Sequence, residues 1–240
     1  MYLSCLLIDL GSNPDRPRPG RRWLRNAYHV HQRLCMAFPS ASRTLTDPHF
    51  LAPYNPADFA EQVHAARGPN TGFLYRIDPL LSGNAVILVQ SAVAPNWDYA
   101  FHNASYLLAA PPDVREFRPC VHNGEHLRFR LQVNPTRKIC TKTGPDGVRR
   151  HGRRVLAIQA EQWLPRRGAS LGLSVLADQT VAQRGYVYMR KPDNPPQHLD
   201  SIRYDGVLEV TDSDKFRKAV ESGIGPGKAF GFGLLSFTPI

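Results

Sequence analysis

The chain has 240 residues, enough for one large domain or two small ones, and its 42% content of apolar residues excludes an intrinsically disordered protein. Thirty Lys and Arg residues outnumber twenty Asp and Glu residues, which gives a formal net charge of +10. A surplus of this size is typical of proteins that bind a polyanion, such as a nucleic acid, an anionic membrane or an acidic protein. The alternative is a basic protein that has no such partner.

No apolar run is long enough to cross a bilayer, so we expect no membrane partner. The first ten residues are apolar but lack a basic region, and this predicts a buried strand rather than a signal peptide. The four cysteines form no C-x-x-C pair, which argues against a zinc site and a disulfide framework. We therefore expect a cytoplasmic protein that needs no metal and no cofactor.

The first half of the chain predicts the element order strand, helix, strand, strand, weak helix or loop, strand, which is the ferredoxin-like pattern. The helix begins at the N-cap Asn26, and a turn at residues 82–84 joins the two middle strands. Residues 40–70 have little periodicity and are expected to form an irregular insertion. The six elements are expected at residues 2–10, 26–38, 72–78, 85–93, 95–108 and 125–134.

The second half repeats this pattern loosely, so we predict an α+β protein with two tandem ferredoxin-like (RRM-like) domains. Their expected bounds are 1–136 and 153–240, with a linker at 137–152. The expected elements are a helix at 153–168 that ends at Gly168, strands at 169–181, 185–191 and 200–210, a helix at 213–223 capped by Asp212, and a last strand at 229–240. A turn is expected near Asp205–Gly206.

Tyr28 and His31 are the first candidates for chemistry. They are three residues apart near the start of the first helix and share a face, whereas His29 and His31 point to nearly opposite sides. The free N–H groups and the dipole of a helix start favour an anion. A phosphate bound there would meet an imidazole and a phenol. Taken alone, however, the stretch is more typical of a helix whose Tyr and His only pack.

Two basic clusters are candidates for phosphate binding. Arginines fill the segment before the first helix, and such a segment is either a solvated loop or one that neutralises phosphates. The second cluster lies where a strand is expected to enter a turn, and a basic hairpin tip can enter or straddle a nucleic-acid groove. The residues are Arg16, Arg18, Arg21, Arg22 and Arg25 in the first cluster, and Arg190 and Lys191 in the second.

The segment at residues 223–233, GIGPGKAFGFG, is unusually rich in glycine. It is not a Walker loop, because Ser222 stands at the first glycine position and Ala229 at the final hydroxyl position. A helix cap explains Gly223 but not the glycines that follow. Glycines such as Gly225 and Gly227 let a backbone approach a phosphate closely, and Lys228 would add a positive charge.

Several of these features together resemble one family, the CRISPR-associated repeat-processing endoribonucleases of the CasE type, which belong to the type I-E Cascade complex. The resemblance spans most of the chain, and its most specific part is the glycine-rich tail. It rests on Tyr28-x-x-His31, the strand LRFRLQVNPTR at 127–137, the basic hairpin VYMRK at 187–191 and the tail GIGPGKAFGFGLLSF at 223–237.

The resemblance implies metal-independent cleavage of a CRISPR repeat RNA at the 3′ base of its hairpin, which gives a 2′,3′-cyclic phosphate and a 5′-OH. It assigns catalysis to His31, mainly as general acid with a base role left open, and to Tyr28, which would orient the phosphate or the attacking hydroxyl. The product would stay bound, together with other Cascade subunits. The residues expected to bind RNA are Arg21, Arg22, Arg25, Arg33, Arg190, Lys191, Gly225, Gly227 and Lys228.

The chain departs from the family pattern at two positions. Gln32 follows the histidine where an arginine is common, and Met36 stands where a lysine is expected one turn later. The residue that stabilises the charge of the transition state is therefore open. A non-catalytic RNA-binding subunit of the same fold is the main alternative to an endoribonuclease.

Overall fold

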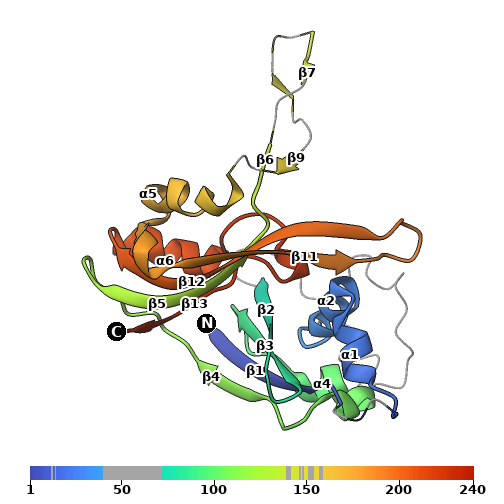
Figure 1. The fold of residues 1–240 in the computed structure, drawn as a ribbon. Coiled ribbons are helices and arrows are strands. Elements are labelled where there is room, and N and C mark those ends of the chain that lie inside the picture. The colour runs from blue at the N-terminus through green and yellow to red at the C-terminus, as the bar shows by residue number, and fades with distance from the viewer. Residues whose placement is uncertain are drawn as a thin grey trace. The chain divides into compact units, whose positions relative to one another are not determined.

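The computed structural model describes residues 1–11, 13, 15–39, 72–138, 142–145, 147, 149–150, 154–156 and 159–240. The insertion predicted at residues 40–70 lies outside the described residues. The chain divides into two compact units (Figure 1). The first consists of Met1–Arg118, Tyr188–Gln197 and Ala229–Gly231, and the second of Pro119–Val187, His198–Lys228 and Phe232–Ile240.

The first unit is an antiparallel sheet with strand order β2-β3-β1-β4 and helices between the strands. This arrangement confirms the predicted ferredoxin-like pattern. Its elements are β1 (Tyr2–Asp9), α1 (Pro19–Leu24), α2 (Ala27–Cys35), β2 (Phe73–Pro79), β3 (Asn84–Ser91), α4 (Trp97–Phe101), the 3₁₀ helix η2 (His102–Leu107) and β4 (Asp113–Glu116).

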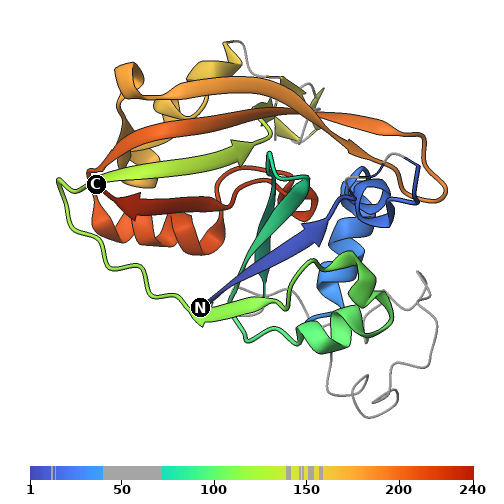
Figure 2. The same cartoon turned by 60° about the horizontal axis from the view of Figure 1, so that its bottom comes forward.

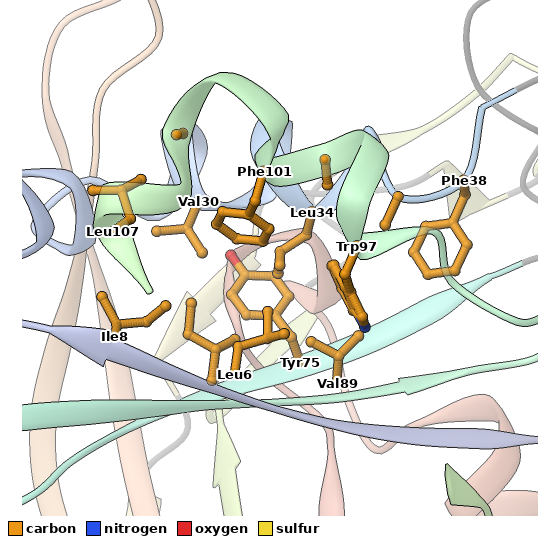
Figure 3. Close-up of a cluster of buried hydrophobic side chains, with 14 residues drawn as sticks. Leu6, Ile8, Val30, Leu34, Phe38, Tyr75, Val89, Trp97, Phe101 and Leu107 are labelled. Carbon is orange, nitrogen blue, oxygen red and sulfur yellow. The ribbon is translucent and has the colours of Figure 1, made fainter. Parts of the chain in front are cut away.

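The alternation of side chains along β1 and the spacing of apolar residues in α2 build the core of this unit. Leu6 and Ile8 point from β1 to the same side, and Val30 and Leu34 lie one turn apart on α2. Figure 3 shows these four residues packed together, with the helices on one face of the strands. Because Val30 and Leu34 face this core, the residues on the other sides of α2 are not needed for it.

The second unit repeats the ferredoxin-like pattern with strand order β10-β12-β5-β13. Strand β11 also pairs with β12, and Figure 2 shows the two as one long hairpin. The elements are β5 (His126–Val133), η3 (Ala160–Gln162), η4 (Pro165–Arg167), α5 (Gly168–Leu171), β10 (Leu173–Val175), η5 (Ala177–Gln179), β11 (Val181–Met189), β12 (Gln197–Val210), α6 (Ser213–Ser222), η6 (Lys228–Phe230) and β13 (Leu235–Pro239).

Paired strands also lie within and next to the expected linker. β6 (Thr136–Lys138) pairs with β9 (Arg154–Leu156), and β7 (Lys142–Thr143) pairs with β8 (Arg149–Arg150). No helix of the described residues is both long and apolar enough to cross a membrane.

The strand predicted at 125–134 exists, but its assignment to the first domain is wrong. It is β5, which pairs with β12 and β13, so the first continuous segment of unit 1 ends at Arg118 and not at residue 136. The fourth strand of the first sheet is β4 instead. Its four residues are all exposed, so it shows none of the apolar alternation that indicates a strand.

Three other predictions in the second half are wrong. The single helix expected at 153–168 is a short strand followed by short helices that end at Gly172. The strand expected at 169–181 is limited to β10, and β12 runs without a turn through Asp205–Gly206. Gly206 is needed there because a Cβ atom would lie 2.5 Å from the carbonyl oxygen of Gln179.

Candidate active site

The start of α2 places Tyr28 and His31 on one face of the helix. The helix begins at Asn26, whose side-chain oxygen accepts a hydrogen bond of 3.2 Å from the Tyr28 N–H. Tyr28 and His31 are half-buried, whereas His29 is exposed. Partial desolvation lowers the pKa of His29 below its ordinary value. The two histidines therefore occupy different environments, as the helical spacing predicted.

The His31 ring is held by aromatic and sulfur contacts on its own unit. It stacks on Phe73 at 5.6 Å and on Tyr75 at 6.5 Å between ring centroids. The Cys35 sulfur, one turn along α2, lies 3.5 Å from the His31 Nε2 atom and 3.9 Å from its Nδ1 atom. These contacts restrict the rotation of the ring and so fix the direction in which it can exchange a proton.

Tyr75 connects β2 to two other segments of the first unit. Its side chain is fully buried, and Figure 3 shows the hydroxyl pointing from the sheet toward the helices. The hydroxyl oxygen lies 3.1 Å from the carbonyl oxygens of both Ala27 and Ala229, so its single proton serves two acceptors. Tyr75 thus holds the first turn of α2 and the segment Ala229–Gly231 while its ring supports His31.

The tip of the hairpin between β11 and β12 contacts the start of α2. The Arg190 N–H donates a hydrogen bond of 3.0 Å to Asn26 Oδ1, and Asn26 Nδ2 donates one of 2.9 Å to the Arg190 carbonyl. The Lys191 Nζ atom lies 5.9 Å from the centroid of the Tyr28 ring, at the outer limit of a cation–π contact. The structure therefore brings Tyr28, Arg190 and Lys191 together.

The arginines near α2 have two kinds of surroundings. Arg21 and Arg22 lie on α1 and Arg25 directly follows it, and all three are exposed. Arg33 is different, because its Nη1 atom donates hydrogen bonds of 2.9 Å to the Ala100 carbonyl and to Asn103 Oδ1. Arg33 thus links α2 to the α4–η2 segment, and its RNA-binding role stays a prediction.

The glycines predicted to bind RNA belong to the second unit and pack against aromatic rings there. Both have positive φ, and a Cβ atom on Gly225 would lie 2.9 Å from Trp163, while one on Gly227 would lie 2.7 Å from Phe232. Close packing therefore explains why glycine stands at these positions, and RNA binding by them stays a prediction. The Lys228 ammonium donates to the Ser222 carbonyl at the end of α6, and desolvation lowers its pKa.

Sequence reasoning missed the residues that hold the candidate site in place. It identified Asn26 only as a helix cap and Tyr75 only as part of a strand. Nothing in the local pattern marks the partner of Asn26, which lies 164 residues away, or that of Tyr75, which lies 154 residues away. Gln32, which stands where an arginine is common in the family pattern, is only 8% exposed. Its side-chain amide is therefore largely shielded from solvent.

No group of three or more His, Cys, Asp or Glu side chains within the described part of the chain is placed to hold a metal ion.

The chain is similar to proteins of known family. A family model described as "CRISPR associated protein" matches residues 1–239. The CRISPR-associated endoribonuclease Cse3 of Thermus thermophilus is 28% identical, and the Cascade subunit CasE of Escherichia coli is 26% identical, each over the full length of both chains. A solved structure of Thermus thermophilus Cse3, bound to an RNA that represents a pre-cleavage complex, superposes with a TM-score of 0.67 at 27% identity.

That superposition covers 99% of this chain and 98% of the Cse3 chain. The two ferredoxin-like sheets, the helix with Tyr28 and His31 and the glycine-rich tail therefore occur in one continuous match rather than in separate local ones. Because the family model spans nearly the whole sequence, the chain belongs to the CRISPR associated protein family, within which it is of the CasE type.

Proposed function

We propose that this protein is an endoribonuclease that binds the stem-loop of CRISPR repeat RNA, cuts it at its 3′ base and keeps the product within a Cascade complex. Its family membership and the names of its relatives support this function. The surplus of basic residues supports an RNA partner, because A-form RNA is recognised mainly by its shape and phosphates. An RNA substrate and the thiols of Cys5, Cys35 and Cys120, which are in no disulfide, fit the cytoplasm.

The observation that carries the proposal is the group of side chains at the start of α2. The helix of nine residues carries the phenol of Tyr28 and, three residues on, the imidazole of His31, and the Lys191 ammonium lies 5.9 Å from the Tyr28 ring near the positive end of the helix. A phosphate at this place would meet a proton donor, a neutral hydrogen-bonding group and a fixed positive charge. These are the parts that phosphodiester transfer requires.

The proposed reaction uses the RNA's own 2′-OH as nucleophile. The 2′-OH loses its proton to water, its oxygen forms a bond to the adjacent phosphorus, and the bond from phosphorus to the 5′ oxygen breaks. His31 gives a proton to the leaving 5′ oxygen, and Tyr28 orients the phosphate. The products are a 2′,3′-cyclic phosphate and a 5′-OH, and no residue becomes covalently attached.

Lys191 stabilises the negative charge of the transition state. The lysine expected at position 36 would have this role, but the uncharged Met36 cannot take it. The Lys191 ammonium group is exposed at the hairpin tip and lies beside the Tyr28 ring. A positive charge at this place would stabilise the additional negative charge of the pentacoordinate phosphorus. Arg21, Arg22, Arg25 and Arg190 then bind phosphates of the RNA.

A cleavage assay in EDTA tests the function and the role of His31 together. Purified protein is mixed with a stem-loop repeat RNA under single-turnover conditions. We expect cleavage by the wild-type protein and a loss of at least about 10²-fold in the His31→Ala variant, because the leaving oxygen then receives no proton from the enzyme. His126→Ala is the matched control and should cleave at the wild-type rate, since His126 is exposed on β5 in the second unit.

A second substrate tests the nucleophile. Replacing the 2′-OH beside the scissile phosphate by hydrogen should abolish cleavage while binding persists. Tight binding of the unmodified RNA without cleavage would instead support the non-catalytic RNA-binding subunit. Equal cleavage by His31→Ala and the wild type would overturn the assignment of His31 but leave the function standing.

A further inference from the structure

Asn26 has more partners than the cap of a helix requires. A cap needs one side-chain oxygen for an N–H group of the first turn, and Asn26 Oδ1 accepts the Tyr28 N–H at 3.2 Å. The same side chain also pairs with both backbone groups of Arg190, through bonds of 3.0 Å to Oδ1 and 2.9 Å from Nδ2. The side-chain amide suits this pairing, because its oxygen accepts while its nitrogen donates.

The surroundings make this pairing stronger than a surface contact. Asn26 is 8% exposed, and its two bonds to the backbone of the exposed Arg190 are partly shielded from water. A hydrogen bond shielded from water is worth more than an exposed one, and leaving a buried amide unpaired is costly. The two bonds therefore fix the backbone at the point where β11 ends and the turn with Lys191 begins.

The pairing has a geometric consequence for the site. Asn26 Oδ1 accepts hydrogen bonds from both the Arg190 N–H and the Tyr28 N–H. This one atom therefore fixes the distance between the backbone of the hairpin tip and the backbone of Tyr28. Lys191 is the next residue of the hairpin, and its ammonium lies 5.9 Å from the Tyr28 ring. Without the pairing, the ammonium would not be held beside the phenol.

We propose that Asn26 is a positioning residue for RNA cleavage, which ties the hairpin tip at Arg190 and Lys191 to the first turn of α2 and so sets the phosphate-binding groups before RNA arrives. The inference rests on the proposed function. In this proposal Asn26 does not contact the RNA. The side-chain charges of the hairpin tip contribute to RNA binding, whereas the position of its backbone, which Asn26 fixes, contributes to the rate of cleavage.

Two substitutions at one position separate the cap from the pairing. Asn26→Ser keeps a good N-cap and stays neutral, but serine is too short to pair with both groups of Arg190. Asn26→Ala removes both the cap and the pairing. We expect both variants to cleave about tenfold more slowly than the wild type at saturating RNA, because a small displacement of positioned groups slows the reaction. Both variants should melt below the wild type because both lose the pairing, and Asn26→Ala should melt lowest because it also loses the cap.

Arg190→Ala provides the reciprocal test. It removes the side-chain charge but keeps both backbone groups that bind Asn26, so it should raise the Kd for RNA and reduce the salt dependence of binding. Asn26→Ser should leave that salt dependence unchanged and lower the single-turnover rate. This split between binding and rate would not arise if Asn26 had only a structural role.

Hydrogen exchange of the Arg190 amide in the absence of RNA measures the pairing itself. Exchange should be slow in the wild type and in Arg190→Ala and faster in both Asn26 variants. The proposal is overturned if Asn26→Ser cleaves at the wild-type rate while Asn26→Ala alone is slow, because the cap and not the pairing would then matter. Unchanged exchange in Asn26→Ser would also overturn it. A wild-type protein that does not cleave at all would contradict the proposed function instead.

Discussion

The buried hydroxyl of Tyr75 shows how one atom supports a site that it does not enter. It lies between the carbonyl oxygens of Ala27 and Ala229, and the ring below it faces His31. Removing the hydroxyl leaves two buried acceptors with one partner fewer, while the ring contact with His31 is kept. The effect on stability can therefore be separated from the effect on ring stacking.

Tyr75→Phe should lower the free energy of unfolding by about 1–3 kcal/mol, because a buried hydrogen bond is lost without a replacement. Urea denaturation followed by circular dichroism measures this change. Tyr106→Phe is the control, since the Tyr106 side chain is 65% exposed and should have no measurable effect. A Tyr75→Phe variant as stable as the wild type would show that the hydroxyl bonds contribute nothing net.

Tyr204 gives a pH-dependent counterpart in the second unit. Its hydroxyl lies 3.1 Å and 3.0 Å from the carbonyl oxygens of Ala160 and Glu161 and accepts the Leu164 N–H at 3.3 Å. Burial, opposed by the bond from Leu164, raises the pKa of Tyr204 from 10.0 to about 12. Because the folded pKa exceeds the unfolded one, the stability that Tyr204 contributes is complete below pH 10 and is lost as the pH rises toward about 12.

We therefore expect Tyr204→Phe to be less stable than the wild type by about 1–3 kcal/mol at neutral pH. The difference between the two should shrink between about pH 10 and about pH 12, because only the wild type has a phenol there whose ionisation opposes folding. Urea unfolding at about pH 8, 10 and 11 checks this. A difference that stays constant would contradict the raised pKa, and the other tyrosines cancel because both proteins contain them.

At the scale of residues, the sequence predicted that Tyr28 and His31 share one face of a helix that begins at Asn26, but it did not predict which residues hold them in place. The pairing of Asn26 with Arg190, and of Tyr75 with Ala229, depends on how distant strands are arranged, which no local pattern contains. Arg33 shows the same limit, because its hydrogen bonds with Ala100 and Asn103 are tertiary contacts.

At the scale of elements, the glycine-rich segment is explained by packing and backbone conformation. Gly225 has a φ of +83°, and the space beside it is filled by the ring of Trp163. That ring cannot easily move, because its N–H donates to the Thr136 carbonyl at 3.3 Å and Arg167 lies over it at 4.9 Å. Sequence reasoning assigned these glycines to a ligand, since the aromatic neighbours come from other parts of the chain.

Gly225→Ala should therefore lower the free energy of unfolding by more than the positive φ alone explains. Gly83 is the matched control, because its φ is +81° and a Cβ atom there would meet nothing within 4 Å. We expect Gly83→Ala to lower the free energy of unfolding by about 1 kcal/mol and Gly225→Ala by about 2–4 kcal/mol, the excess coming from overpacking. Chemical denaturation of both variants measures the difference, and equal costs would show that the Trp163 contact is unimportant.

Strand β5 shows why the elements were predicted better than their arrangement. Its alternation of apolar and polar residues predicted a strand, but alternation does not name the partner strands. The exposed strand β4 had no such pattern and was missed, so β5 was counted as the fourth strand of the first sheet. The two ferredoxin-like sheets were nevertheless predicted, because a regular strand and helix order tolerates an error in one strand.

At the scale of the whole molecule, the net charge of +10 predicts that RNA binding weakens as salt rises. Arg190 and Lys191 are exposed and adjacent, and each should contribute about one unit to the slope of log K against log salt. The double variant Arg190→Ala/Lys191→Ala should therefore reduce that slope by about two units. Filter binding of the repeat RNA over a series of salt concentrations measures it.

Arg217→Ala/Lys218→Ala is the control with the same change of charge. Both side chains are exposed on α6, and we expect them to leave the slope nearly unchanged. If both double variants reduce the slope equally, the total charge governs binding and the hairpin tip has no special part in it.

The division of the first unit into three chain segments has a consequence for the order in which the protein is made. All four strands of its sheet lie within Met1–Arg118, so this core is available early in synthesis. The partners of Asn26 and Tyr75, at Arg190 and Ala229, leave the ribosome only later. A nascent chain can thus hold a folded sheet for some time before the candidate active site is assembled, and we expect this site to be completed only when the chain is almost fully synthesised.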